Sequence, residues 1–261
     1  MGFEADGIVF SYGDRKVLDG LSFALETGHF YGILGPNGCG KSTLIDILMG
    51  LQKPQHGHIR YRGRPLGRRR RRDLAREMAL VPQNFYINFP FTALEVVMMG
   101  RYPHMPRFSP PAAGDLAAVE SVMARTGTLP FKHRYMTEMS GGERQRIIFA
   151  RALVQDTPVL MLDEATSNLD IHHTLALMDI VAEEVRHGNK LVIAVIQDIN
   201  LAASYCDRLI LMKDGRIVDA GATAGVLTPE NIHAVFGVAS RIYTDPYTRD
   251  LRVSFGKEAA T

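Results

Sequence analysis

The sequence predicts an α/β fold, and three features of the chain carry that prediction. An apolar run at residues 30–34, a glycine-rich loop and a helix-like run at residues 44–49 give the order strand, turn, helix. Residues 158–164 read as a buried parallel strand that ends in two carboxylates. Short alternating strands around residues 7–10 and 21–25 read as an antiparallel flank. We therefore expect parallel strands joined by helices, with an antiparallel sheet beside them.

The loop after the first of these runs fits the pattern G-x-x-x-x-G-K-S/T, in which backbone N–H groups face a triphosphate and the lysine reaches its β- and γ-phosphates. The phosphates would lie at the amino end of the next helix, where unpaired N–H groups and the helix dipole favour negative charge. The flanking strand and helix disfavour the alternative, a glycine turn without a ligand. We predict a nucleotide site here, with Ser42 placed to hold Mg²⁺. Its residues are Gly35, Pro36, Asn37, Gly38, Cys39, Gly40, Lys41, Ser42 and Thr43.

The two carboxylates after the apolar run at residues 158–162 are Asp163 and Glu164. A buried parallel strand delivers its last side chains to the carboxyl edge of the sheet, where open α/β sheets bind ligands. Asp163 can then reach the Mg²⁺ shell, and Glu164 can polarise a water for attack on the γ-phosphate. Two acids that only end a strand and cap the next turn are the alternative, which the phosphate loop in the same chain disfavours.

A second glycine motif lies about a hundred residues after the first. It covers residues 140–146, begins with Ser140, Gly141, Gly142 and Glu143, and opens an apparent helix with apolar residues at positions 147, 148, 150 and 153. The amino end of that helix is a second place at which an anion can bind.

Taken together, the motifs resemble those of the ATP-binding cassette (ABC) family, in which the phosphate loop, the Ser-Gly-Gly signature and the Leu-Asp-Glu strand follow in this order. The resemblance covers nearly the whole chain and implies ATP and Mg²⁺ as cofactors. It implies a P-loop NTPase (RecA-like) core of residues 1–83 and 140–237, with an antiparallel β flank. An inserted α-helical subdomain of residues 84–139 and a C-terminal extension of residues 238–261 complete the expected domain.

The resemblance also implies roles for three smaller segments. Tyr12 resembles the aromatic residue that stacks on adenine, and Gln83 resembles the Q-loop glutamine, a Mg²⁺ ligand that belongs to the catalytic set. Residues 167–170 resemble the D-loop, with Asp170 at the nucleotide. Taken singly, Tyr12 reads as a strand-edge aromatic and Gln83 as an ordinary loop amide, but their order and spacing favour the functional interpretation.

Partners follow from the same resemblance. In ABC proteins the signature helix faces the γ-phosphate bound by the other subunit, so Ser140, Gly141, Gly142 and Glu143 would contact ATP across a homodimer. The dimer would drive separate transmembrane permease subunits, and through them a substrate-binding protein. Nucleotide would hold the dimer together, and hydrolysis would let the halves part.

Gln197 departs from the family pattern. It follows the strand-like stretch at residues 190–196, which is apolar after Lys190, at the place where the family has its switch histidine. Glutamine can donate a hydrogen bond to a phosphate oxygen, but it carries neither a proton nor a positive charge near neutral pH. Either turnover is slow, or Gln197 takes over the positioning role of the histidine; we therefore count Gln197, Glu164 and Gln83 as the catalytic set. A natural variant and a substitution that traps ATP would read the same in the sequence.

Composition agrees with a peripheral motor subunit. No apolar run approaches the length of about 20 residues that a membrane span needs, and the amino terminus lacks the apolar core of a signal peptide. The two cysteines, Cys39 and Cys206, lie far apart and fit a reducing compartment. The arginine run at residues 68–72 reads as a solvated face, with anionic lipid or an acidic partner as the first alternative and nucleic acid as the second. Because the net charge is only +2, we expect no nucleic acid partner, and we place the chain at the cytoplasmic face of the inner membrane.

Local signals predict further elements along the chain. Thr92 is an N-cap signal for a helix over residues 93–99, and Thr228 is another for a helix near the C-terminus. The segment at residues 242–255 contains a turn at Asp245–Pro246 and carries no recognisable chemistry. The remaining expectations are a proline-rich break at 102–111, helices near 115–125 and 199–205, and a strand pair at 208–212 and 215–218.

Segment matches indicate which kind of ABC protein this is. The phosphate loop at residues 35–41, the segment 98–104 and the single-cassette length resemble the ATPase subunits of importers for iron-siderophores, haem and cobalamin. A stand-alone ABC ATPase that acts on nucleic acid or the ribosome is disfavoured, because neither a long insert nor a second cassette is present. An exporter subunit remains open as an alternative.

Overall fold

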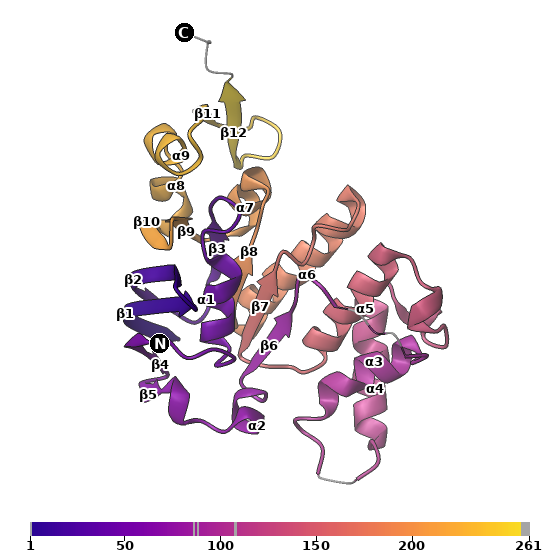
Figure 1. Ribbon diagram of the computed structural model, residues 1–261. Coiled ribbons are helices and arrows are strands. Elements are labelled where there is room, and N and C mark those ends of the chain that lie inside the picture. The colour runs from indigo at the N-terminus through magenta and orange to yellow at the C-terminus, as the bar shows by residue number, and fades with distance from the viewer. Residues whose placement is uncertain (1, 86, 88, 107–108, 257–261) are drawn as a thin grey trace. The chain divides into compact units, whose positions relative to one another are not determined.

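The computed structural model describes residues 2–85, 87, 89–106 and 109–256. The chain divides into two compact units (Figure 1). Unit 1 consists of Met1–Arg69 together with Leu191–Thr261, and unit 2 is Arg70–Lys190. We describe each unit by itself.

The antiparallel flank of unit 1 is a sheet with the strand order β2-β1-β4-β5. Its strands are β1 (Phe3–Tyr12), β2 (Arg15–Leu25), β4 (His56–Tyr61) and the short β5 (Arg64–Pro65), which a 3₁₀ turn over Leu66–Arg68 follows. Alternation explains β1, because Phe3, Ala5, Ile8 and Phe10 are buried while most residues between them are partly exposed. The predicted flank is confirmed, and its first two strands are longer than the sequence indicated.

The second sheet of unit 1 is built around β3 (Phe30–Leu34). Two parallel strands, β8 (Leu191–Val195) and β9 (Arg208–Lys213), pair with it on either side. Every residue of β3 and β8 is buried, which is the pattern of a parallel strand covered on both faces. The strand β10 (Arg216–Ala222) pairs antiparallel with β9 and confirms the predicted strand pair.

Helices follow these strands in unit 1. The helix α1 (Lys41–Leu48) follows β3 and the glycine loop, and α7 (Ile199–Tyr205) follows β8, where the sequence predicted it. The Asp198 carboxylate caps α7 by accepting hydrogen bonds from the backbone N–H groups of Asn200 and Leu201, at 2.8 and 3.2 Å. The N-terminal ends of α1 and α7 thus lie where the chain leaves β3 and β8.

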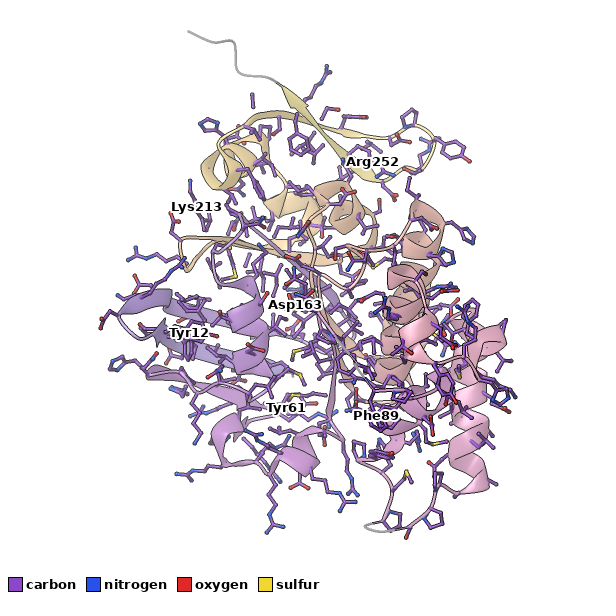
Figure 2. All side chains as sticks on the ribbon, turned by 45° about the vertical axis from the view of Figure 1, so that its right-hand side comes forward. Tyr12, Tyr61, Phe89, Asp163, Lys213 and Arg252 are labelled. Atoms are coloured by element: carbon purple, nitrogen blue, oxygen red, sulfur yellow. The ribbon has the colours of Figure 1, made fainter. Side chains whose placement is uncertain are left out.

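The C-terminal part of unit 1 contains α8 (Thr223–Val226), α9 (Pro229–Phe236) and a hairpin of β11 (Ala239–Thr244) and β12 (Leu251–Gly256), which carries Arg252 in Figure 2. Thr228 caps α9 as predicted, accepting from the Asn231 N–H at 3.1 Å. The hairpin strands were not predicted. The side chain of Asn200 holds β12 through both main-chain groups of Val253, at 2.7 and 3.2 Å. Residues 257–261 of the predicted extension lie outside the described residues.

In unit 2, the parallel strands β6 (Met78–Val81) and β7 (Val159–Asp163) pair with each other. Its longest helix is α6 (Ile171–Gly188), and α5 (Gly141–Leu153) precedes β7. A short helix, α2 (Arg71–Leu74), precedes β6. The apolar run of β7 is buried as the sequence predicted. This burial fixes the end of the strand, where Asp163 is the last residue and Glu164 follows.

The helical region of unit 2 confirms the predicted helices. Thr92 caps α3 (Ala93–Met98), which a 3₁₀ turn over Met99–Arg101 continues, and α4 covers Ala113–Arg125. The remaining 3₁₀ turns lie at Leu129–Phe131 and Met136–Glu138. The helix α3 contacts both α4 and α5, and the predicted break contains residues 107 and 108, which lie outside the described residues. Among the helices that the structure describes, none combines the length and the apolar character that a membrane span requires.

Candidate functional site

The phosphate-loop residues of unit 1 follow β3 without interruption and lead into α1. Gly40 is the N-cap of α1 and has a positive φ of 105°, a conformation that favours glycine. A Cβ at Gly40 would lie 2.6 Å from the Leu18 side chain, and one at Gly35 would lie 2.2 Å from the Met212 carbonyl oxygen. Glycine is therefore required at both positions for packing as well as for conformation.

Lys41 is buried, with 6% of its surface exposed. Its ammonium group donates to two carbonyl oxygens of the loop, those of Gly35 at 2.8 Å and Pro36 at 2.9 Å. The first N–H groups of α1 have no acceptor within the helix, and the glycine at the N-cap has no side chain to cap them. This end of α1 therefore combines a cation with backbone donors, which is the chemistry that an oligophosphate requires.

The thiol of Cys39 is buried in the same loop. Burial raises the pKa of the Cys39 thiol, and the nearby Lys41 charge only partly opposes that effect. The thiolate is therefore disfavoured, which makes this cysteine a packing residue in the free loop.

Tyr12 and Gln197 are the other predicted site residues of unit 1. The Tyr12 side chain stands at the end of β1 on the flank (Figure 2), half exposed, with its ring edge-to-face against Phe10 at 4.9 Å. Gln197 is exposed and lies two residues after β8, directly before the capping residue Asp198. The roles assigned to Tyr12 and Gln197 remain predictions.

In unit 2, the structure brings two predicted catalytic residues together. Gln83 follows β6, Glu164 follows β7, and the Gln83 amide nitrogen donates to the Glu164 carboxylate at 2.5 Å. Asp163, which directly precedes Glu164 as the last residue of β7, is partly exposed and is labelled in Figure 2. The parallel pairing of β6 and β7 accounts for this meeting, because the carboxyl ends of parallel strands share one edge.

Glu164 adopts a positive φ of 48°, which is uncommon for a residue other than glycine, and its side chain is nearly buried. The backbone after it is held at two points. Its own carbonyl oxygen accepts from the Ser167 N–H at 3.1 Å, and the Ala165 carbonyl accepts from the Gln145 side-chain amide at 2.9 Å. Gln145 lies inside the second glycine motif, residues 140–146, but no role was predicted for it.

The signature residues begin α5 through a reciprocal capping box. The Ser140 hydroxyl accepts from the Glu143 N–H at 3.3 Å, and the Glu143 carboxylate accepts from the Ser140 N–H at 2.8 Å. Arg134 donates to the same carboxylate at 2.9 Å. The bond from the Ser140 backbone is the main reason that the pKa of Glu143 is lowered. A Cβ at Gly141 would meet no atom within 4 Å, so that glycine faces open space.

Asp170 caps α6 in this structure. Its carboxylate accepts from the His173 backbone N–H at 2.8 Å and contacts the His173 ring nitrogen at 2.8 Å. The backbone bond is the largest cause of the lowered pKa of Asp170. The nucleotide contact predicted for Asp170 remains a prediction.

The predicted Mg²⁺ ligands are Ser42 in unit 1 and Gln83 and Asp163 in unit 2. Hydroxyl, amide and carboxylate oxygens are the donors that Mg²⁺ prefers, so the donor set fits the ion. The Gln83 amide nitrogen is bonded to Glu164, and its oxygen is the atom that would ligate a cation. Among the described residues there is no cluster of three or more histidine, cysteine or acidic side chains that could hold a metal ion.

Comparisons with known proteins agree with these motifs. The cobalamin import ATP-binding protein BtuD of Halobacterium salinarum is 40% identical over 97% of this chain, and this chain spans 63% of that protein's length. The ferric enterobactin transport ATP-binding protein FepC of Escherichia coli is 36% identical over 92% of this chain and 88% of that protein.

The fold comparison agrees with the sequence comparison. A solved chain from an ABC transporter described as metal-chelate type, in an inward-facing conformation, is similar with a TM-score of 0.84 at 25% identity, over 98% of both chains. Residues 18–167 match the ABC transporter family. This chain therefore belongs to the ABC transporter family.

Proposed function

We propose that this chain binds and hydrolyses ATP and thereby powers a separate membrane permease. The observation that carries the proposal is the phosphate loop, in which Lys41 and the uncapped start of α1 lie together after a buried strand. Family membership and the names of the relatives, which are ATP-binding proteins of import systems, support the same conclusion.

Nucleotide binding is assigned to unit 1. On this proposal the β- and γ-phosphates replace the carbonyl oxygens of Gly35 and Pro36 as partners of the Lys41 ammonium group. The N–H groups at the start of α1 donate to the same phosphates, and Tyr12 offers its half-exposed ring to the adenine. Binding therefore exchanges hydrogen bonds within the loop for bonds to the ligand.

Hydrolysis is assigned to Glu164, with Gln83 bonded to it. Glu164 takes the proton of the attacking water, and Gln83 orients the carboxylate of Glu164 through their hydrogen bond. Ser42, Gln83 and Asp163 would hold Mg²⁺, which when bound neutralises developing charge on the phosphates. Gln197 contributes a neutral hydrogen-bond donor to the γ-phosphate.

Partners and location are part of the proposal. Ser140, Gly141 and Gly142 begin a helix of 13 residues, whose amino end suits the γ-phosphate bound by a second copy of the chain. We propose a homodimer attached to transmembrane permease subunits at the cytoplasmic face of the inner membrane, with a substrate-binding protein on the far side of the permease. Co-purification with a protein of several membrane spans tests this attachment.

The proposed cargo is an iron-siderophore, haem or cobalamin-type compound. Support comes from the cobalamin and ferric enterobactin systems to which the two relatives belong. The cargo would contact the permease and the binding protein, so its selection does not depend on the residues described here.

The test is ATP binding and steady-state hydrolysis by the purified chain. Glu164→Gln should lower kcat by about 10²- to 10⁴-fold and leave ATP binding intact, because it removes a general base without changing the side chain's shape. Lys41→Ala should abolish binding itself. Glu183→Gln, the same substitution at an exposed position of α6, is the matched control and should behave as wild type. Failure of the wild-type chain to bind ATP, or full activity of Glu164→Gln, would contradict the proposal.

A further inference from the structure

The helix α5 contacts the backbone beside Glu164 through one buried amide. Gln145 lies in the second turn of α5 and is 7% exposed. Its side-chain nitrogen donates to the carbonyl oxygen of Ala165 at 2.9 Å. Ala165 directly follows Glu164 and is itself buried, so this bond holds the chain at the residue next to the proposed base.

Glu164 needs such support, because its φ of 48° is a conformation that non-glycine residues adopt only where the surroundings enforce it. Two glutamine amides provide the support from different sides. Gln83 binds the carboxylate, and Gln145 binds the backbone. The bond from Gln83 fixes the orientation of the Glu164 carboxylate, and the bond from Gln145 fixes the backbone that carries the Glu164 side chain.

The helix also reaches the Gln83 segment. The Arg151 guanidinium, in the last turn of α5, lies over the Phe85 ring at 4.2 Å from its centroid. Phe85 is two residues after Gln83, so one end of α5 contacts the segment of Gln83 and its second turn contacts the backbone after Glu164. The amino end of the same helix is the signature Ser140, Gly141 and Gly142.

We propose that Gln145 is a positioning residue that fixes Glu164 for catalysis and ties it to the signature helix. The proposal rests on the proposed function, in which Glu164 is the base. A displacement of α5 moves the Ala165 carbonyl through a direct hydrogen bond, and a base that is misplaced by about 1 Å loses about two orders of magnitude in rate. A movement of the signature end of α5 would therefore change the position of Glu164 within unit 2.

The experiment compares two glutamine anchors, the buried Gln145 and the partly buried Gln155, in steady-state ATP hydrolysis by the full chain. Gln145→Met should lower kcat by about tenfold or more, while the KM for ATP changes less than about twofold. Gln155→Met is the matched control, because Gln155 also donates its amide to main-chain carbonyls, those of Ala75 and Met78, just beyond the end of α5. It should lower the melting temperature to a similar extent and leave kcat near the wild-type value.

A second comparison separates positioning from packing. In a Glu164→Gln background there is no base to position, so adding Gln145→Met should cause no further loss of the residual rate. A role in packing alone would lower the residual rate by the same factor as in the wild type, and would overturn the inference. If Gln145→Met does not fold, Gln145→Asn keeps an amide that is too short to reach Ala165 and must also lower kcat.

The outcomes distinguish the inference from the function on which it rests. If Glu164→Gln is as active as wild type, the assignment of the base fails. If Glu164→Gln is inactive but Gln145→Met and Gln155→Met have equal kcat values, the base assignment stands and the positioning role of Gln145 is refuted.

Discussion

On the proposed function, Gln197 donates a neutral hydrogen bond to the γ-phosphate, where a charged donor would bind more strongly. It is exposed at the end of the β8 segment, directly before the Asp198 cap of α7. Replacing it with histidine should raise the rate of ATP hydrolysis about 10- to 150-fold, because a charge-assisted hydrogen bond contributes about 1.5–3 kcal/mol to transition-state binding. The measurement is kcat of the chain with its permease at saturating Mg²⁺ and ATP.

The pH dependence separates charge from shape in that variant. An unperturbed imidazole carries its proton below a pKa of about 6.5, so the gain from Gln197→His should be larger at pH 6.5 than at pH 8.5. Gln52→His places the same side chain elsewhere in unit 1 and should change nothing. An unchanged rate for Gln197→His would mean that a neutral donor suffices at this position.

Single residues also mark the limit of what the sequence predicts. The glycines at positions 35 and 40 and the lysine at position 41 follow a local pattern, and the structure gives each a local reason. The bond between Gln83 and Glu164 joins residues 81 positions apart, and that between Gln145 and Ala165 joins residues 20 apart. No local pattern specifies those partners, because they depend on how β6, β7 and α5 pack.

The start of α5 depends on its capping box. Glu143→Ala removes the acceptor of the Ser140 N–H and the partner of Arg134, and should lower the free energy of unfolding by about 1 kcal/mol. Urea denaturation at pH 7 followed by circular dichroism measures this. Glu143→Gln keeps an oxygen that can accept from Ser140 and should cost less.

The same carboxylate gives a pH-dependent stability. The Ser140 backbone N–H is the main cause that holds the pKa of Glu143 below its ordinary value of 4.5. A lowered native pKa contributes stability above the unfolded value, and that contribution is lost as the pH falls through the native pKa. The difference between wild type and Glu143→Ala should therefore be full at pH 7 and shrink below pH 4.5. A difference that stays constant at pH 3 would contradict this explanation.

Elements with local signals were predicted, and elements that depend on distant partners were not. Thr92 and Thr228 cap α3 and α9 as their sequences indicated, because a cap bonds within three residues. The strand β4 is mostly polar and exposed, and it exists because β1 pairs with it. The strand β12 is held by Asn200, which lies 53 residues before Val253. The turn predicted at Asp245–Pro246 precedes β12, but neither strand has an apolar run of its own to indicate it.

At the scale of the whole molecule, the α/β class with its antiparallel flank and helical region could be predicted because buried parallel strands read as continuous apolar runs. β3, β8 and β7 all have this character. The proposed homodimer, by contrast, involves a second copy of the chain, which no pattern within one chain specifies.

The proposed ATP-dependent dimer gives the last prediction. With Mg²⁺ and ATP, the Glu164→Gln chain should shift from a monomer of 28.9 kDa to a species of twice that mass, because bound ATP is not hydrolysed and continues to link the two subunits. Light scattering after size exclusion measures the mass. Gly141→Glu, added to the same chain, should keep it monomeric with ATP bound, since the new carboxylate would repel the phosphate of the partner.

Gly141 suits this test because a Cβ there would meet no atom within 4 Å, so we expect the substitution to leave the fold of unit 2 intact. Gly114 in α4 is equally open and gives the matched control, because Gly114→Glu adds the same charge on a helix that does not carry the signature. It should dimerise as the parent chain does. Two results would show that the signature helix does not bind nucleotide across a dimer. One is dimerisation of the chain that carries both Glu164→Gln and Gly141→Glu with ATP. The other is a mass of the Glu164→Gln chain that is the same with ADP as with ATP. Loss of the dimer in Gly141→Glu alone would assign the amino end of α5 to the ATP held by the other subunit, since the two glutamates differ only in their helix.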